Sequence, residues 1–221
     1  MSLFGELDVY HDSAERSAAI NMAIDEALLE QATRPLLRFY RWNHPALSFG
    51  YFGQYEDVAK YATERDMVRR WTGGGIVFHG DDLTYAIVIP ETAELFASSS
   101  KAIYSVIHLA LRDALIAGGT GVELATAEAA QKSEACFASP VIADVLLNGH
   151  KVAGAAHRRT RRGLLHQGSI QNIDVSTELA AAFANRLSGE CIERQISPRL
   201  CTRADEIATL KYGTDSWLRR R

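Results

Sequence analysis

The sequence predicts an α+β domain, in which a mixed, largely antiparallel sheet is flanked by helices. Strand-like segments follow one another in runs separated by short turns, and they do not alternate strictly with helices as βαβ units require. Two long segments, 17–32 and 100–119, carry apolar residues at helical spacing and supply helices that can cover such a sheet.

The bulk composition is that of an ordinary globular protein. The chain has 221 residues, of which 47% are apolar and 23% charged, and this is enough for one well-buried core. We expect a single domain over residues 1–221, with 176–221 as a helical C-terminal segment.

The formal net charge of −3 provides no global attraction for nucleic acid. No apolar run approaches the roughly 20 residues of a membrane span, and the N-terminus lacks the order of a signal peptide. We therefore expect a cytoplasmic protein.

The first half of the chain predicts one clear helix followed by strands. The helix at 17–32 has its apolar side chains on one stripe, and Pro35 closes it. The elements expected after it are two aromatic-rich strands at 36–42 and 46–52, a short helix at 56–66, and three strands within 67–90 that are separated by a glycine turn and an acidic turn.

The second half predicts a hairpin between helices. The helix at 100–119 has serine N-caps at Ser98–Ser100 and ends at Gly118–Gly119. Asn148–Gly149 is a strong hairpin turn, because both central positions of that turn favour positive φ. The elements expected in this half are strands at 141–159 and 163–175, a helix at 176–189, and further helix from about residue 203.

Three consecutive glycines, Gly73, Gly74 and Gly75, stand between two strand-like runs and cost conformational entropy. Either their N–H groups approach an anionic or acyl ligand, or they form a tight turn or bulge. The run is neither a P-loop nor a dinucleotide-binding fingerprint. The flanking Arg69, Arg70 and His79 favour the ligand interpretation, because they place cations beside the loop.

Lys151 follows the hairpin turn on a strand that then becomes very small, from Ala153 to Ala156. The small side chains leave room for another group, and a lysine ammonium there can pair with a phosphate or a carbonyl oxygen. The alternative is a surface lysine at the mouth of a hairpin.

Cys136 is either a buried thiol or a nucleophile whose pKa is lowered by a nearby cation such as Lys151. The other two cysteines, Cys191 and Cys201, are expected in the core without a chemical role. Three widely spaced cysteines give neither a disulfide framework nor zinc-ligand spacing, and no carboxylate or cysteine stands at ligand spacing from His157 or His166. We therefore expect no metal site.

Together, five stretches resemble the biotin/lipoate protein ligase and octanoyltransferase superfamily. They are "NMAIDEALL", "LRFYRWNHPALSFGYFGQ", "RRWTGGGIVFHGDDLTYAIVIP", "ACFASP" and "NGHKVAGAAHRRTRRGLLHQGSI". The resemblance implies a fold like the catalytic domain of biotin ligases and class II aminoacyl-tRNA synthetases. It also implies transfer of an acyl group to a lysine of a carrier domain.

The resemblance assigns roles to particular residues. Cys136 matches the acyl-carrying cysteine of the octanoyltransferases, and Lys151 matches the family's binding lysine; these two are the expected catalytic residues. The expected substrate-binding residues are Arg70, Gly73, Gly74, Gly75, His79, Gly154, Ala155 and His166. The strands around Leu47–Phe49, Ile76–Phe78 and Val152–Ala155 are expected to line an acyl tunnel.

The resemblance favours cysteine-dependent transfer of an octanoyl or lipoyl group, because "DDLTYAIVIP" and "ACF" are closer to the transferases than to the ligases. The donor would be acyl carrier protein, and the acceptor a lipoyl carrier domain such as glycine cleavage H protein or a 2-oxoacid dehydrogenase E2. This reaction requires no cofactor. The alternative is a single-domain lipoate-protein ligase that uses ATP and Mg²⁺. A non-catalytic acyl-binding protein is a third possibility, whereas nucleic-acid binding is disfavoured by the net charge.

Overall fold

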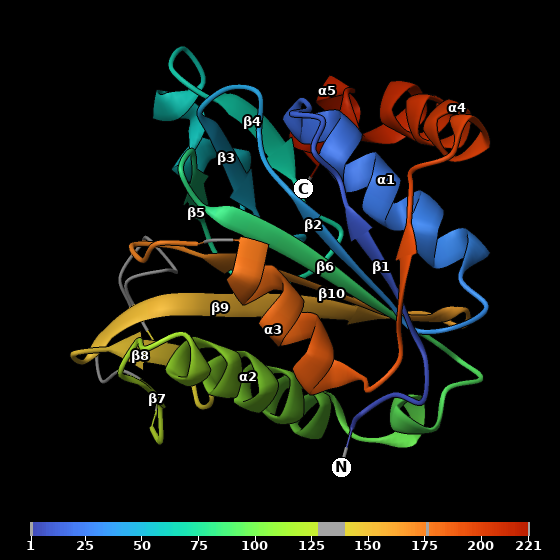
Figure 1. The fold of residues 1–221 in the computed structure, drawn as a ribbon. Coiled ribbons are helices and arrows are strands. Elements are labelled where there is room, and N and C mark those ends of the chain that lie inside the picture. The colour runs from blue at the N-terminus through green and yellow to red at the C-terminus, as the bar shows by residue number, and fades with distance from the viewer. Residues whose placement is uncertain (1, 128–139, 176, 221) are drawn as a thin grey trace.

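In the computed structural model, residues 2–127, 140–175 and 177–220 are described. Eight strands form one sheet in the order β11-β1-β2-β6-β10-β9-β8-β7 (Figure 1). The first three strands pair in parallel, and every other neighbouring pair is antiparallel. The strands are β1 (Leu7–His11), β2 (Leu36–Tyr40), β6 (Leu83–Pro90), β7 (Val122–Leu124), β8 (Val145–Leu147), β9 (His150–Arg159), β10 (Gly163–Ile170) and β11 (Cys191–Arg194).

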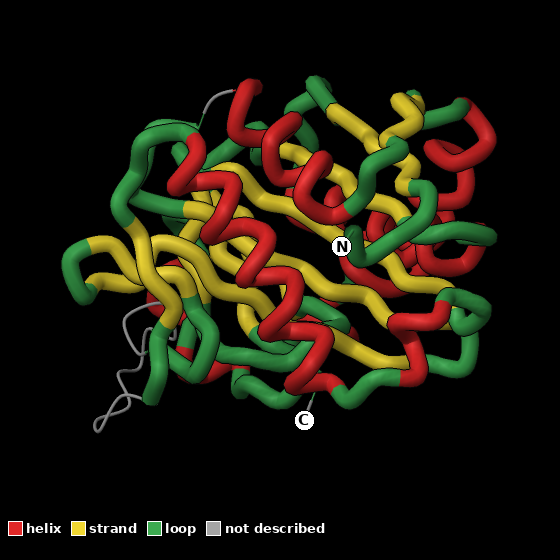
Figure 2. The backbone as a smooth tube through the Cα atoms, turned by 60° about the horizontal axis from the view of Figure 1, so that its bottom comes forward, coloured by secondary structure: helices red, strands yellow, loops and turns green. Residues whose placement is uncertain are grey.

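Helices cover both faces of this sheet. One face packs against α2 (Ser100–Ala117) and α3 (Thr177–Leu187), which share a core with Leu37, Ile87 and Leu164 (Figure 2). The other face packs against α1 (Ala18–Gln31) and α4 (Pro198–Ile207), through Leu36, Val88 and Leu165. Consecutive residues of one strand therefore serve different cores, as the pleat requires.

A second, three-stranded sheet lies on the α1 side (Figure 1). Its order is β4-β3-β5, and its strands are β3 (Ala46–Phe49), β4 (Asp66–Arg69) and β5 (Val77–His79). The loop with the three glycines connects β4 to β5. The C-terminal α5 (Asp215–Leu218) contacts β4, and Leu218 packs against the small core of this sheet.

Several expected boundaries agree with the structure. Ser99 caps α2 by accepting a hydrogen bond from the N–H of Ala102, and Gly118 ends the helix. Asn148 and Gly149 have φ values of 52° and 78°, so the expected hairpin turn is present between β8 and β9. The expected α+β class, with a mixed and largely antiparallel sheet, is confirmed.

Other expectations differ from the structure. The segment 56–66, expected as a short helix, forms two separate 3₁₀ turns, η1 (Tyr55–Asp57) and η2 (Ala59–Tyr61). A third 3₁₀ turn, η3 (Glu94–Ala97), precedes α2. The C-terminal segment, expected to be helical, also contributes the edge strand β11. A π-helical turn (Ala208–Tyr212) continues α4.

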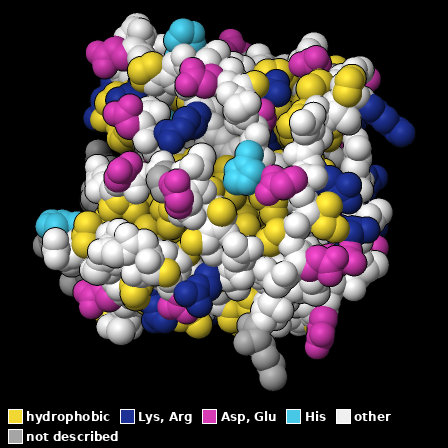
Figure 3. All heavy atoms as spheres, in the orientation of Figure 1, with side chains coloured by type: hydrophobic (Ala, Val, Ile, Leu, Met, Phe, Trp, Pro, Cys, Tyr) yellow, Lys and Arg dark blue, Asp and Glu magenta, His cyan; other side chains and the backbone are white. Residues whose placement is uncertain are grey.

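Charged side chains of both signs are interspersed over the face seen in Figure 3. Within the described residues, no helix combines the length and apolar character needed to cross a membrane.

Candidate active site

A narrow cavity of about 50 Å³ opens between the small sheet, the glycine loop and strands β9 and β10. Its wall is mostly apolar and small, with a few charged and hydroxyl groups. The lining residues are Met22, Tyr40, Trp42, Ser48, Arg70, Gly74, Gly75, Val77, His79, Thr84, Lys151, Gly154, Ala155, Ala156, Gln167, Gly168 and Ser169. The expected loop and the expected lysine strand thus meet at one cavity, although they are far apart in the sequence.

Lys151 lies along its own strand and reaches the cavity wall. Its Nζ is 2.9 Å from Oδ2 of Asp144, and the lysine side chain is only 7% exposed. A Cβ atom at Gly154 would lie 2.1 Å from Cε of Lys151. Gly154 therefore leaves room for the side chain of Lys151 itself, and the ammonium is buried beside a carboxylate.

Asp144 is in turn held from two sides. It accepts a hydrogen bond from the N–H of Val141 at 2.7 Å and one from the hydroxyl of Tyr104. The same hydroxyl accepts from the N–H of Ala155 at 3.2 Å. Burial, together with the negative charge of Asp144, raises the pKa of Tyr104, so this phenol stays protonated and donates to the carboxylate. These contacts fix the counter-ion that positions Lys151.

Arg70 gives the glycine loop its shape. Its NH2 group donates to the carbonyls of Gly73 (3.0 Å) and Gly75 (2.9 Å), and the intervening Gly74 has a φ of +84°. A Cβ at Gly50 would lie 1.9 Å from the carbonyl oxygen of Gly74, so the loop also packs directly against backbone. The loop is therefore a tight turn that borders the cavity through Gly74 and Gly75, and the approach of its N–H groups to a ligand stays a prediction.

His79 belongs to a second buried group at the cavity. Its Nε2 lies 2.7 Å from Oγ of Ser48 and its Nδ1 2.8 Å from Oδ2 of Asp82. NH1 of Arg70 donates to Oγ of Ser48 at 2.7 Å. The ring of Trp42 stacks on His79 with centroids 4.1 Å apart.

Asp82 is ionised in this group. Burial favours the neutral acid, but the neighbouring imidazole and hydrogen bonds from His79, Ser169 and the N–H of Gly80 hold the pKa of Asp82 at about 2. Burial lowers the pKa of His79, so its ring is neutral at pH 7. His79 was expected as a cation beside the loop, and the structure gives it a different state.

Arg69 also departs from the expected role as a cation facing a ligand. Its guanidinium donates to backbone carbonyls of two segments, the turn after β3 and the C-terminal α5 region. The acceptors are Tyr51, Gly53, Trp217, Leu218 and Arg220. This arginine ties the C-terminus to the small sheet.

His166, expected among the substrate-binding residues, does not line the cavity. Its side chain is fully buried and its ring lies near those of Tyr85, Tyr104, His108 and His157. The neighbouring Gln167 and Ser169 of β10 face the cavity instead. Alternation along the strand turns His166 toward α2.

Several residues of the site were not singled out from the sequence: Ser48, Asp82, Tyr104 and Asp144. Asp82 has a local signal, because it follows His79 by three residues in a turn. The predicted nucleophile Cys136 lies outside the described residues, so its position relative to Lys151 stays a prediction. Cys191 and Cys201 are both half-buried and away from the cavity.

The family model for the lipoyl protein ligase A/B catalytic domain matches residues 17–209. The chain belongs to this family. Octanoyltransferase LipM of Oceanobacillus iheyensis is 39% identical over 170 residues, which cover 72% of this chain and 62% of that protein.

Among solved structures, a lipoate-protein ligase A bound with ATP matches with a TM-score of 0.77 at 20% identity, covering 99% of this chain and 98% of that chain. The bipartite lipoate protein ligase of Thermoplasma acidophilum, studied with its E2 lipoyl domain, gives a TM-score of 0.75 at 19% identity, covering 97% and 96%. At these identities the structural similarity shows the shared fold.

Membership confirms the resemblance drawn from the five sequence stretches. The matched range includes every residue that the resemblance assigned to the site. The chain spans between 59% and 62% of the length of three curated octanoyltransferases that it matches. The activity of those longer proteins is therefore a proposal for this chain.

Proposed function

We propose that this protein transfers an octanoyl or lipoyl group from a thioester donor to a lysine of a lipoyl carrier domain, through an acyl-Cys136 intermediate. The observation that carries the proposal is the buried Lys151–Asp144 pair at the wall of a narrow, largely apolar cavity. Relatives named octanoyltransferase, at 32% to 39% identity, support the same reaction.

The cavity wall suits a fatty acyl chain. Val77, Ala155, Ala156 and Met22 offer apolar contact, and burying a methylene group contributes about 0.8 kcal/mol. A charged substrate of the same width would lose its hydration there without a matching partner along most of the wall. The cationic groups at this cavity mark where the polar end of such a substrate would lie.

Lys151 is proposed to stabilise the developing oxyanion. The thiolate of Cys136 would attack the thioester carbonyl, and the ammonium would stay close to the oxygen that gains negative charge. Loss of one such donor typically lowers the rate by about 10²–10³. The carrier's lysine amine would then attack acyl-Cys136, and formation of an amide from a thioester is downhill without ATP.

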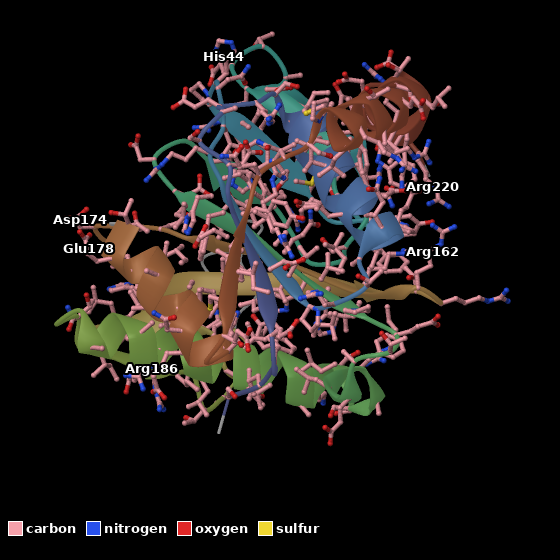
Figure 4. The ribbon with its side chains drawn as sticks, turned by 45° about the vertical axis from the view of Figure 1, so that its right-hand side comes forward. His44, Arg162, Asp174, Glu178, Arg186 and Arg220 are labelled. Carbon is pink, nitrogen blue, oxygen red and sulfur yellow. The ribbon has the colours of Figure 1, made fainter. Side chains whose placement is uncertain are left out.

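A basic surface beside the glycine loop is proposed to dock acidic carriers. Arg158 stacks between the rings of Tyr51 and Trp71, and Arg220 also lies over Tyr51. Arg162 projects from the β9–β10 turn toward the same side as Arg220 (Figure 4). Trp71 directly follows Arg70, so this surface adjoins the cavity. Complementary charge of this kind mainly raises the association rate.

The decisive experiment separates transferase from ligase. The protein is incubated with octanoyl-acyl carrier protein and a lipoyl domain, without ATP, and octanoylated domain is measured by mass spectrometry. We expect product from the wild type, none from Cys136→Ala, and a rate about 10²–10³ lower for Lys151→Met. Cys201→Ala is the matched control for cysteine removal.

A different outcome would support the alternative function. Product that requires ATP and free octanoate or lipoate, and that persists in Cys136→Ala, indicates a lipoate-protein ligase. Bound octanoate without modification of any carrier indicates an acyl-binding protein.

A further inference from the structure

Ser48, His79 and Asp82 form a hydrogen-bonded row that ends at the cavity. The contacts are 2.7 Å from Ser48 Oγ to His79 Nε2, and 2.8 Å from His79 Nδ1 to Asp82 Oδ2. A hydroxyl beside an imidazole that is oriented by a carboxylate is an arrangement with which enzymes move protons. Ser48 and His79 both line the cavity, and Asp82 lies behind them.

The positions of the protons follow from the partners. The Asp82 carboxylate only accepts, so the proton of the neutral His79 ring lies on Nδ1 and its Nε2 accepts from Ser48. A guanidinium only donates, so Arg70 occupies one lone pair of Ser48 Oγ at 2.7 Å. Ser48 retains a second lone pair that can accept a proton from a group in the cavity.

The surroundings hold this arrangement rigidly. Thr84 and Ser169 donate to Oδ2 of Asp82 at 2.9 and 2.6 Å. Trp42 stacks on the imidazole and donates to Thr84 at 2.8 Å. The three side chains are therefore held in one geometry before any substrate binds. Proton transfer along hydrogen bonds requires such a fixed arrangement.

Four titratable side chains line the cavity in the described part of the chain: Tyr40, Arg70, His79 and Lys151. Burial raises the pKa of Tyr40 well above its usual value, and its hydroxyl donates to Asp25. Arg70 donates to Ser48, and Lys151 is engaged in the ion pair with Asp144 at 2.9 Å. His79 is the neutral base of this set.

Amide formation needs such a base. An amine that attacks a carbonyl gives a tetrahedral adduct with a positively charged nitrogen, and the amide forms only when that nitrogen gives up a proton. Resting on the acyl transfer described above, we propose that Ser48 and His79 are the relay that takes this proton from the acceptor lysine, with Asp82 as a positioning residue.

The step is balanced without another reactant. The amine nitrogen forms a bond to the acyl carbon, and the carbon–sulfur bond breaks to release a thiolate. The amine's proton passes to Ser48 Oγ while the Ser48 proton passes to His79 Nε2. The imidazolium, stabilised by Asp82, then returns a proton to the thiolate, and the row regains its starting state.

The test measures the two half-reactions separately. Acyl-enzyme formation from octanoyl-acyl carrier protein is followed by mass spectrometry, and amide formation is then started by adding a lipoyl domain. In His79→Gln we expect an unchanged yield of acyl-enzyme and a rate of amide formation lower by about 10²-fold or more. His44→Gln is the matched control, because His44 lies on an exposed turn (Figure 4) and does not line the cavity.

The dependence of the amide step on pH distinguishes a relay from a structural role. The charged groups that face His79 are Asp82, Arg70 and Arg65, whose NH1 donates to the His79 carbonyl at 3.1 Å. In both proteins the rate rises with pH as the acceptor lysine loses its ammonium proton. In the wild type the rate also falls at low pH, where His79 becomes protonated, and because burial lowers the pKa of His79 this second inflection lies below the usual imidazole range. The inflection is absent in His79→Gln. If His79→Gln does not fold, Ser48→Ala is measured in its place. This substitution removes a single oxygen atom, and we expect it to change the pH dependence in the same way.

Three results overturn the relay. One is an unchanged amide rate in His79→Gln and Ser48→Ala. The second is an equal loss in both half-reactions with the wild-type pH profile. The third is labelling of Ser48 by a fluorophosphonate, lost in Ser48→Ala, which would make the serine a nucleophile. A wild type that forms neither acyl-enzyme nor product instead contradicts the proposed function.

Discussion

Two groups of buried polar side chains, one around Arg38 and one around Asp82, lie on the same face of the large sheet. They differ in whether their charged side chains reach the cavity. In the first, Arg38 donates to Asp25 at 2.8 Å and to Asp12 at 2.7 Å, and neither member of the Arg38–Asp25 pair lines the cavity. In the second, Asp82 connects through His79 and Ser48 to Arg70, which faces the cavity.

The two carboxylates show the consequence. Burial raises the pKa of Asp25 even though Arg38, Tyr40 and Gln167 all donate to it. The pKa of Asp82, also buried, is held at about 2 by the imidazole and hydroxyl donors around it. The first group joins α1 to β2 away from the cavity, whereas the second connects Asp82 to side chains that line the cavity. Variants that damage one and spare the other test this division.

Arg38→Met is expected to have the largest effect, on stability. It leaves the fully buried Asp25 without its cation, and removal of one partner of a buried ion pair costs about 3–5 kcal/mol. Urea unfolding measures the loss in the free energy of unfolding. Arg34→Met, which breaks an exposed pair with Glu6, is the control and should cost less than about 1 kcal/mol. Equal losses would show that the Arg38 group is no more structural than a surface pair.

Gly154→Ala is expected to affect catalysis mainly, at a smaller cost in stability than Arg38→Met, because the ammonium is displaced and not removed, and Asp144 keeps its donors Tyr104 and Val141. The new Cβ would overlap Cε of Lys151, the far end of a flexible side chain, so the ammonium must leave Asp144 while the backbone stays in place. A displacement of about 1 Å in a site can lower the rate about 10²-fold.

The measurement is the transfer rate together with the thermal unfolding midpoint. Gly121→Ala is the matched control, since a Cβ there meets nothing within 4 Å. A loss of stability in Gly154→Ala as large as that of Arg38→Met would indicate that the glycine serves the fold.

The same contrast shows how much the sequence could predict. Strong local signals were sufficient for α1, α2 and the hairpin turn at Asn148–Gly149, whose φ values are both positive. The edge pairing of β1 with β11 was missed, because Leu7 and Cys191 are adjacent only through the tertiary fold. The segment 56–66 is too short to hold a helix by itself.

The site divides in the same way. The glycine loop and Lys151 stand in recognisable motifs. Asp144 was missed because a register shift between Val145 and Leu146 in the hairpin brings it beside Gly154, and spacing alone does not reveal the shift. Arg69 is the last residue of β4 and Arg70 follows it; their side chains turn to opposite sides, and only Arg70 reaches the cavity. Which of the two does so depends on the register of β3 with β4, which has no sequence signal.

The smallest expected effect is a pH dependence of stability that belongs to Asp82. Its pKa falls from an ordinary value of 3.8 to about 2 in the folded protein. A lowered folded-state pKa stabilises the fold above the unfolded value, and this contribution is lost as the pH falls through the folded value. Asp82 should therefore contribute about 2 kcal/mol at neutral pH, and this should disappear between about pH 4 and pH 2.

Urea unfolding of the wild type and Asp82→Asn over that range measures the contribution as the difference between them. The difference in the free energy of unfolding between the wild type and Asp82→Asn should shrink as the pH falls. The control is the same difference for Asp81→Asn, which changes the exposed neighbour. A difference that stays constant with pH would mean that the carboxylate charge adds nothing to the fold. The Asp82 group would then resemble the Arg38 group, in which burial outweighs the favourable partners of the acid.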